Sequence, residues 1–307
     1  MTLRQWLLLL FLAALWGASY LFIKLALADV SPSGIVFVRT LLAALLLLPV
    51  AAAKGALRGL RSALGPLLAL AVIQVAGPFL LISQGEREIS SSLAGILVAT
   101  APIFTAMLAL RLDPTERSSG WGLVGVGIGL GGVALLLGID ASGDAGAFVG
   151  ALLVVLAGAG YAVGGFIVKR GFSGAQPVGV AAAAMAVSAL LMLPLAALTA
   201  PHTVPGSTAI VALLVLGLAG TGLAFLIFYT LIGQAGPARA SLVAYLAPGF
   251  AVVYGVAFLD ERVSAGTLAG LGLILAGSWL AAGGRLLSGG VEPPSGAVAA
   301  PRAREAS

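Results

Sequence analysis

The sequence contains no cysteine and a single histidine, His202, in 307 residues. Without cysteine the chain offers no disulfide bonds, no thiolate nucleophile and no cysteine ligands for zinc or iron–sulfur clusters. His202 lies between Pro201 and Pro205, in a connection between apolar runs. A histidine-based triad or an H-E-x-x-H metal site within a membrane is therefore excluded as well. We expect no metal site, no cofactor and no catalytic residue.

Charge is also scarce, since 9% of the residues are charged while 60% are hydrophobic and the mean hydropathy is +1.13. A soluble domain carries about 25% charged residues, so we interpret the chain as an integral membrane protein. Runs such as 7–15 and 181–191 lack the alternation of a membrane β-barrel. With about 20 apolar residues per spanning helix, the predicted fold is all-α. Its ten spans fall at about 5–25, 34–53, 65–84, 90–110, 120–138, 147–168, 178–199, 209–232, 239–258 and 266–286.

The few charges indicate an orientation. With the N-terminus in the cytoplasm, twelve of the 16 basic residues face inward, three (Lys24, Arg87, Arg262) face outward, and Arg39 lies within the second span. The positive-inside rule then predicts a multi-pass protein of the inner membrane with both termini in the cytoplasm. This scattered placement also argues against nucleic-acid binding. The acidic residues expected on the outer side are Asp29, Glu86, Glu88, Asp140, Asp144, Asp260 and Glu261.

The sequence repeats itself at an offset of about 145 residues. Residues 16–24 match 161–169, residues 97–102 match 243–248, and Gly125, Gly127 and Gly132 match Gly270, Gly272 and Gly277. We therefore predict a first five-helix repeat over 1–140 and a second over 141–287, followed by a disordered cytoplasmic tail over 288–307. Because five is odd, the second repeat enters the membrane in the opposite direction, a plan typical of secondary transporters with a central substrate site.

A glycine-rich stretch at 127–132 matches G-x-G-x-x-G, but it lies inside an apolar helix with no strand before it. It is therefore not a nucleotide-binding fingerprint. The same region and its counterpart near Gly266 and Gly270 have G-x-x-x-G spacing, which lets helices approach closely. We expect spans five and ten to pack together within one chain, with dimerisation as the less favoured alternative. A monomer is slightly favoured.

Several motifs resemble those of a known family. They are Trp16-Gly17 followed by Lys24, Arg39 in the second span, Ala-Pro at 101–102 and 247–248, and Leu-Asp-Glu-Arg at 259–262 before a glycine-rich helix. Across residues 6–285 the chain resembles the drug/metabolite transporter superfamily, EamA type, and within it the bacterial exporters of aromatic and other amino acids. The resemblance implies a ten-helix transporter whose two repeats rock about a central cavity.

Aromatic and small polar residues fall at mid-span positions and predict the lining of that cavity. Trp16 and Tyr20 share one helix face, as do Gln74 and Pro78 in the third span. The alternative is that the aromatic residues belong to interfacial belts and that Gln74 bonds a neighbouring helix. The predicted substrate-binding residues are Trp16, Tyr20, Gln74, Pro78, Ile82, Tyr161, Phe225, Ser241 and Tyr245.

Four further residues are candidates for gating or helix bending. Pro102 and Pro248 each remove a helical hydrogen bond, which produces either a flexible point or an inert kink. Lys24 and Lys169 are repeat counterparts at opposite mouths of the bundle, and the alternative is that both extend to the lipid headgroups. Arg39 is expected to be structural, extending outward or pairing with a carbonyl or carboxylate group.

The middle of every apolar run lacks Asp and Glu, the usual proton relays and sodium ligands of coupled carriers. We therefore expect facilitated export, or coupling that does not use a buried carboxylate. An uncharged, aromatic-walled cavity favours a neutral or zwitterionic substrate with an apolar part. The sequence thus predicts an exporter of small metabolites, amino acids above all. The alternatives are a drug or nucleotide-sugar exporter of the same superfamily and, less favoured, an intramembrane enzyme.

Overall fold

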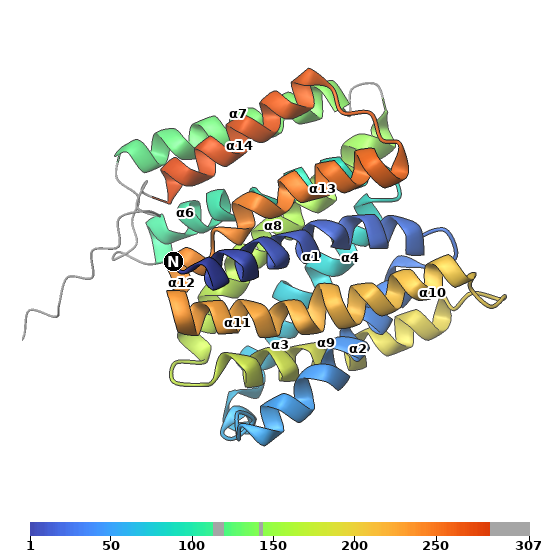
Figure 1. The fold of residues 1–307 in the computed structure, drawn as a ribbon, viewed down its shortest axis with the longest axis vertical. Coiled ribbons are helices and arrows are strands. Elements are labelled where there is room, and N and C mark those ends of the chain that lie inside the picture. The colour runs from blue at the N-terminus through green and yellow to red at the C-terminus, as the bar shows by residue number, and fades with distance from the viewer. Residues whose placement is uncertain (113–119, 141–143, 283–307) are drawn as a thin grey trace, which may run out of the picture.

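The fold comes from a computed structural model that describes residues 1–112, 120–140 and 144–282. Within those ranges every regular element is a helix (Figure 1). The predicted tail at 288–307 lies outside the described residues. The elements are α1 Leu3–Ala26, α2 Pro32–Ala53, η1 Leu60–Ala63, α3 Leu64–Leu70, η2 Ala71–Ala76, α4 Gly77–Gly85, α5 Ser91–Val98, α6 Ala101–Leu112, α7 Gly120–Asp140, α8 Ala145–Gly171, α9 Pro177–Leu198, α10 Ser207–Leu214, η4 Val215–Leu223, α11 Ala224–Ala235, α12 Pro237–Ala240, α13 Val243–Leu259 and α14 Ala265–Ala281.

These elements form the ten predicted spans. Within the described residues, eight helical segments are long and apolar enough to cross a membrane, and the shorter apolar helices α13 and α14 complete the set. The third span consists of α3, η2 and α4, the fourth of α5 and α6, and the eighth of α10, η4 and α11. The all-α fold class and the number of spans are thus confirmed.

Side-chain caps begin five of the helices. Thr2, Ser31, Ser90, Asp144 and Ser264 accept hydrogen bonds from backbone N–H groups in the first turns of α1, α2, α5, α8 and α14. The first four N–H groups of a helix have no partner within it, and the bilayer core supplies no water to bond them. These residues therefore fix where the helices can begin.

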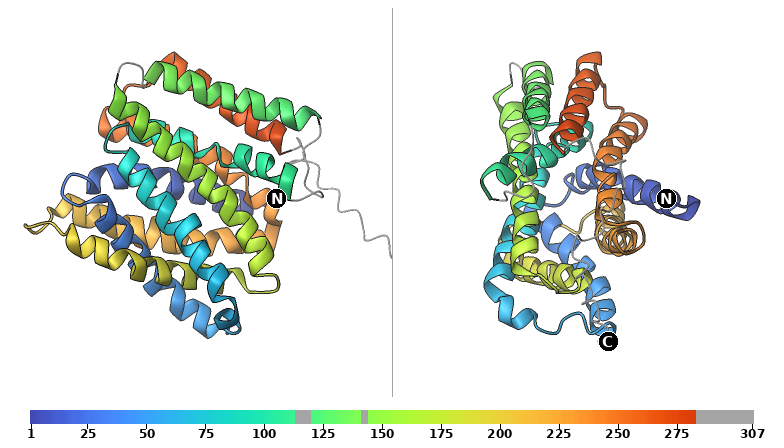
Figure 2. Two further views of the ribbon diagram at one scale, coloured as in Figure 1. Left: turned by 180° about the vertical axis from the view of Figure 1, so that it is seen from behind. Right: turned by 90° about the vertical axis from the view of Figure 1, so that its left-hand side faces the viewer.

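Helices α7 and α14 pack side by side at one edge of the bundle (Figures 1 and 2). At Gly125 and Gly277 the two backbones come so close that an added Cβ would lie 2.5–2.7 Å from backbone atoms of the other helix, or nearer. The predicted packing of spans five and ten within one chain is confirmed. The two helices can approach this closely because glycine has no side chain at the crossing.

The two repeats run in opposite directions through the bundle. The ammonium group of Lys24, near the end of α1, bonds the carbonyl oxygen of Glu86, and the neighbouring Glu88 lies against Gly146 at the start of α8. The last turn of α1 and the first turn of its counterpart α8 therefore lie at the same end of the molecule. We call this the α4–α5 end, after the connection at 86–90, and the opposite one the α8–α9 end, after residues 172–176.

Both repeats also contain a π-helical segment in the third of their five spans. Ala71–Ala76 and Val215–Leu223 have wider turns than an α-helix, and they occupy equivalent positions at the repeat offset. Such wide turns are rare and are often found at functional sites. In the first repeat, Pro78 follows directly as the second residue of α4. The wide turn therefore lies where proline has already removed a hydrogen-bond donor.

The other two prolines differ in their surroundings. Helix α5 ends at Val98, and Pro102 is the second residue of α6, so this proline lies just after an interruption of the fourth span. Pro248, in contrast, lies inside α13, which is a single helix from Val243 to Leu259. A role for either proline in gating stays a prediction.

Candidate functional site

An aromatic cluster joins α1 to α11. The ring of Trp16 lies 5.3 Å from that of Phe228 and 6.2 Å from that of Phe225, measured between ring centroids. Tyr229 extends the group, with centroid distances of 5.8 Å to both phenylalanines. The structure thus brings together Trp16 and Phe225 of the predicted site. It adds Tyr229, which the sequence analysis did not single out.

A buried cation lies between the two repeats. Arg39 of α2 is 6% exposed, and its Nε donates a hydrogen bond of 2.7 Å to Oγ1 of Thr221 in η4. Its guanidinium carbon is 3.7 Å from the ring centroid of Phe79. Thr221 in turn donates to the carbonyl oxygen of Leu216, five residues earlier, as the π-helical turn allows. Arg39 thus has a hydroxyl and a ring as its described partners, and the expected carbonyl or carboxylate is absent among them.

Two tyrosines of the predicted site lie near this cation. Tyr20 of α1 and Tyr161 of α8 are close enough for electrostatic interaction with Arg39 and with each other. The ring of Tyr20 also packs against Gly95 of α5. Arg39 thus bonds Thr221 of the second repeat and lies within electrostatic reach of a tyrosine from each repeat, Tyr20 and Tyr161. We call these four residues the polar centre.

The burial of Glu86 is the largest difference between the sequence prediction and the structure. Glu86 was expected to face the exterior, but its side chain is 0% exposed and its two carboxylate oxygens have no hydrogen-bond partner among the described residues. Glu86, which directly follows the third span, is covered by surrounding helices and is therefore not exposed; the side of the membrane on which it lies stays a prediction. Burial raises the pKa of its carboxyl well above the usual range, against the opposing effect of Lys24. Glu261 raises this pKa further, and Arg39 lowers it.

Lys24 and Glu261 tie the α4–α5 end together. The Nζ atom of Lys24 donates to the carbonyl oxygens of Glu86 and Ile89, the latter at 2.9 Å. The carboxylate of Glu261, in the connection between α13 and α14, accepts from the backbone N–H groups of Ser91 and Ser92 at 2.7 and 2.9 Å. A carboxylate at a helix N-terminus is favoured by the helix dipole. The second repeat is thereby joined to the first at this end.

Three more of the predicted residues serve helix packing. The side chain of Gln74 packs against Gly164, and the ring of Pro78 packs against Gly160. Both are so close that a Cβ added at the glycine would clash with them. Pro78 and Ile82 are buried, Ile82 at 3% exposed in the hydrophobic core. Gln74 keeps part of its surface accessible. A substrate contact from these positions stays a prediction.

The remaining predicted residues lie toward the α8–α9 end. Ser241 is in the turn between α12 and α13, and Tyr245 is in the first turn of α13; both are half-buried. Lys169 is exposed in the last turn of α8. The predicted site residues therefore extend along the bundle and do not form one compact cluster.

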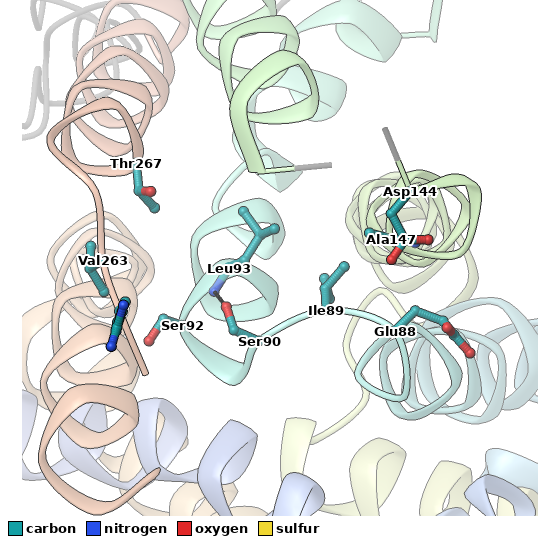
Figure 3. Close-up of a pocket in the computed structure, with 10 residues that line it drawn as sticks. Glu88, Ile89, Ser90, Ser92, Leu93, Asp144, Ala147, Val263 and Thr267 are labelled. Atoms are coloured by element: carbon teal, nitrogen blue, oxygen red, sulfur yellow. Dashed lines mark hydrogen bonds between the residues drawn. The ribbon is translucent and has the colours of Figure 1, made fainter. Parts of the chain in front are cut away.

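A surface pocket of about 300 Å³ opens at the α4–α5 end (Figure 3). Its lining comes from the connection after α4, from α5, from the start of α8 and from the segment before α14. Glu88 and Asp144 lie on one side of it, with Val263 and Thr267 across from them (Figure 3). Because it is open at the end of the helices, we assign it no part in holding a substrate between them.

Sequence reasoning missed the buried state of Glu86 and the central position of Arg39. The predicted third span ended at about residue 84, just before Glu86. Hydropathy along the chain does not show which other helices cover a residue. One signal was present: Ser83 and Glu86 are three residues apart and share a helix face. Tyr20 and Lys24 similarly share a face of the first span.

Comparisons with known proteins agree with this architecture. The chain is 28% identical over 267 residues to the uncharacterized inner membrane transporter YedA of Escherichia coli, covering 85% of each. It is 26% identical over 276 residues to the uncharacterized transporter YvbV of Bacillus subtilis, covering 89% of each. A solved crystal structure with 19% identity matches with a TM-score of 0.65 over 92% of this chain and 97% of its own, which shows the fold alone. The EamA-like transporter family matches twice, over residues 4–138 and 148–283, and the chain therefore belongs to that family of membrane transporters.

Proposed function

We propose that this transporter exports small zwitterionic metabolites, amino acids above all and aromatic and other neutral ones in particular, across the inner membrane by alternating access. The observation that carries the proposal is a buried cation and a buried carboxyl group within electrostatic reach of each other, Arg39 and Glu86. A zwitterion has the complementary pair of charges. Its carboxylate would bind Arg39, and its ammonium group would bind Glu86.

A row of side chains on α1 connects this charged pair to the aromatic cluster. Trp16, Tyr20 and Lys24 are spaced four residues apart, about 6 Å per step along the helix. Trp16 packs in the aromatic cluster, Tyr20 lies near Arg39 and Glu86, and Lys24 bonds the backbone at Glu86. The row therefore favours a substrate with charged groups at one end and an apolar or aromatic side chain at the other.

The same charges weigh against other cargoes. A nucleotide sugar carries two negative charges on its diphosphate, and a buried carboxyl group beside the binding cation would oppose it. The orientation predicted from the positive-inside rule places the α4–α5 end outside. In that orientation, the Lys24 and Glu261 contacts close the transporter toward the exterior.

The test is counterflow of labelled neutral amino acids into proteoliposomes. Wild-type protein should exchange them faster than empty liposomes do, and Trp16→Ala and Tyr161→Ala should exchange them more slowly. Trp121→Ala is the matched control, because Trp121 is 74% exposed on α7, away from this cluster. If no amino acid crosses faster than in empty liposomes, the substrate assignment is wrong. If both variants match the wild type, the site is wrong.

A further inference from the structure

The buried polar atoms that lack a partner come from one short stretch of the chain. Among the described residues, the buried side-chain atoms without a hydrogen-bond partner are Oγ of Ser83, both carboxylate oxygens of Glu86 and Oγ of Ser91. All three side chains are at most 1% exposed. They lie within nine residues of sequence, at the end of α4 and the start of α5. This cluster can accept a small species or a proton without first breaking an existing bond.

The surroundings favour the neutral form of Glu86 in this conformation. An ionised carboxylate in an apolar interior loses its hydration without compensation. Glu86 also caps the C-terminal end of α4, where the helix dipole is negative and opposes a second negative charge. The nearest cation, Lys24, donates to the carbonyl oxygens of Glu86 and Ile89. A proton on Glu86 removes the cost of the buried charge.

Charged groups of both signs act on Glu86. Lys24 from α1 and Arg39 from α2 favour its ionised form, while Glu261 from the α13–α14 connection opposes it. Tyr20 of α1 also lies within electrostatic reach, and α5 contributes the hydroxyl of Ser91. Because burial is the main cause of the raised pKa of Glu86, a conformation that admits water or a cationic group would make Glu86 release its proton.

We propose that Glu86 exchanges a proton for the ammonium group of the amino acid, so that this protein is a proton-for-substrate antiporter. The proposal rests on the function proposed above and adds its driving force. It also replaces the expectation of facilitated export, because that expectation assumed that no buried carboxylate was present.

The exchange cycle conserves charge and protons. Open to the cytoplasm, Glu86 releases its proton to the cytoplasm and its carboxylate binds the ammonium group, while Arg39 binds the substrate carboxylate. After the two repeats rearrange, the substrate leaves to the exterior with its ammonium group, and Glu86 takes a proton from the exterior. The closed, protonated carrier then returns. One substrate leaves and one proton enters, with no covalent bond in the substrate formed or broken.

A sodium ion is the competing occupant, because the cluster presents only oxygen ligands. Lys24 and Arg39 both act on Glu86 and disfavour a lone cation there, whereas the ammonium group of an amino acid arrives together with a carboxylate that pairs with Arg39. A proton is accommodated more easily, since it forms a neutral carboxyl group that both cations tolerate. Sodium coupling is therefore an outcome that would contradict the proposal.

The first test needs no substrate. Thermal stability of the purified protein is measured against pH for wild type, Glu86→Gln and Glu88→Gln. A folded-state pKa raised above the unfolded value gives stability that is complete at low pH and is lost as pH rises through the folded pKa. The wild-type Tm should therefore fall relative to that of Glu86→Gln as pH rises above about 4. Glu88, two residues away and exposed, is the matched control and should keep the wild-type trend. Parallel curves for wild type and Glu86→Gln would contradict a protonated Glu86.

The second test follows protons directly. Phenylalanine is added outside proteoliposomes that contain a pH-sensitive dye, with equal pH on both sides and with or without sodium. Wild type and Glu88→Gln should make the lumen more alkaline as phenylalanine enters, and Glu86→Gln should not. Net phenylalanine uptake without a pH change, pH movement that persists in Glu86→Gln, or sodium movement in place of proton movement would each overturn the antiport proposal while leaving amino acid transport intact. Absence of counterflow would overturn the proposed function itself, and the exchange with it.

Discussion

The two repeats share a backbone plan but differ in where they bury charge. Both contain a π-helical segment in the third of their five spans. At the repeat offset, however, Arg39 corresponds to Ala184 and Glu86 to Leu231, and each of these four residues is buried. Lys24 bonds carbonyl oxygens across the α4–α5 end, whereas its counterpart Lys169 is exposed. In the proposed function, the similar backbones would allow the two halves to rock, and the charges of the first repeat would form the binding site.

The largest effect on amino acid counterflow is expected from a substitution of Arg39. Arg39→Met removes the cation proposed to bind the substrate carboxylate, and a hydrogen bond to a charged group contributes about 1.5–3 kcal/mol. Amino acid counterflow should therefore fall by about tenfold or more, since ~1.4 kcal/mol corresponds to a tenfold change. Arg87→Met, at an exposed residue of the α4–α5 connection, should leave counterflow unchanged. Equal rates for the two variants would contradict a role of the buried Arg39 in binding the substrate.

The second-largest effect is expected on how often the α4–α5 end opens. It should follow from a substitution of Glu261, which joins the second repeat to α5. Glu261→Gln removes the negative charge that accepts two backbone N–H groups and should open the α4–α5 end more often. Because the chain has no cysteine, a single Ser83→Cys reporter can be labelled from that side. We expect labelling to rise about tenfold in Glu261→Gln, from the loss of charged hydrogen bonds. Unchanged labelling would show that Glu261 does not hold this end closed.

The two lysines offer a direct comparison of the repeats. Lys24→Met loses two hydrogen bonds to buried carbonyl oxygens, so it should alter labelling of the same Ser83→Cys reporter by several-fold. Lys169→Met, at the equivalent exposed position, should change labelling little. Similar effects of the two substitutions would mean that the repeats are more alike than their surroundings indicate.

The smallest expected difference is at the α7–α14 crossing, where the repeats are alike. Gly132 and Gly277 are repeat counterparts, and a Cβ at either would lie within 3.0 Å of the facing helix. Overpacking costs about 1–3 kcal/mol, so Gly132→Ala and Gly277→Ala should lower Tm by similar amounts. Gly131→Ala and Gly272→Ala, where nothing lies within 4 Å, are the matched controls. A loss of stability in the controls alone would contradict the described crossing.

Composition and the repeat offset predicted the ten helices, the opposite directions of the repeats and the packing of α7 on α14. Trp16 and Phe225 were both predicted to line one cavity, and their ring centroids lie 6.2 Å apart. The burial of Glu86 could not be predicted, because it depends on helices distant in sequence that cover the end of the third span. Arg39 was treated as structural for the same reason, since Thr221, its partner, is 182 residues away. Periodicity identifies which residues share a face, but not which helix that face meets.

Recognition of both ends of a zwitterion can be measured most directly by competition. Counterflow of labelled phenylalanine is followed in proteoliposomes in the presence of unlabelled phenylalanine, phenylalaninamide or N-acetylphenylalanine. The amide lacks the carboxylate proposed to bind Arg39, and the acetylated compound lacks the ammonium group proposed to bind Glu86. We expect each analogue to compete about tenfold or more weakly than phenylalanine, for the loss of one charged interaction. Competition by both analogues as strong as that of phenylalanine would contradict a site built from Arg39 and Glu86.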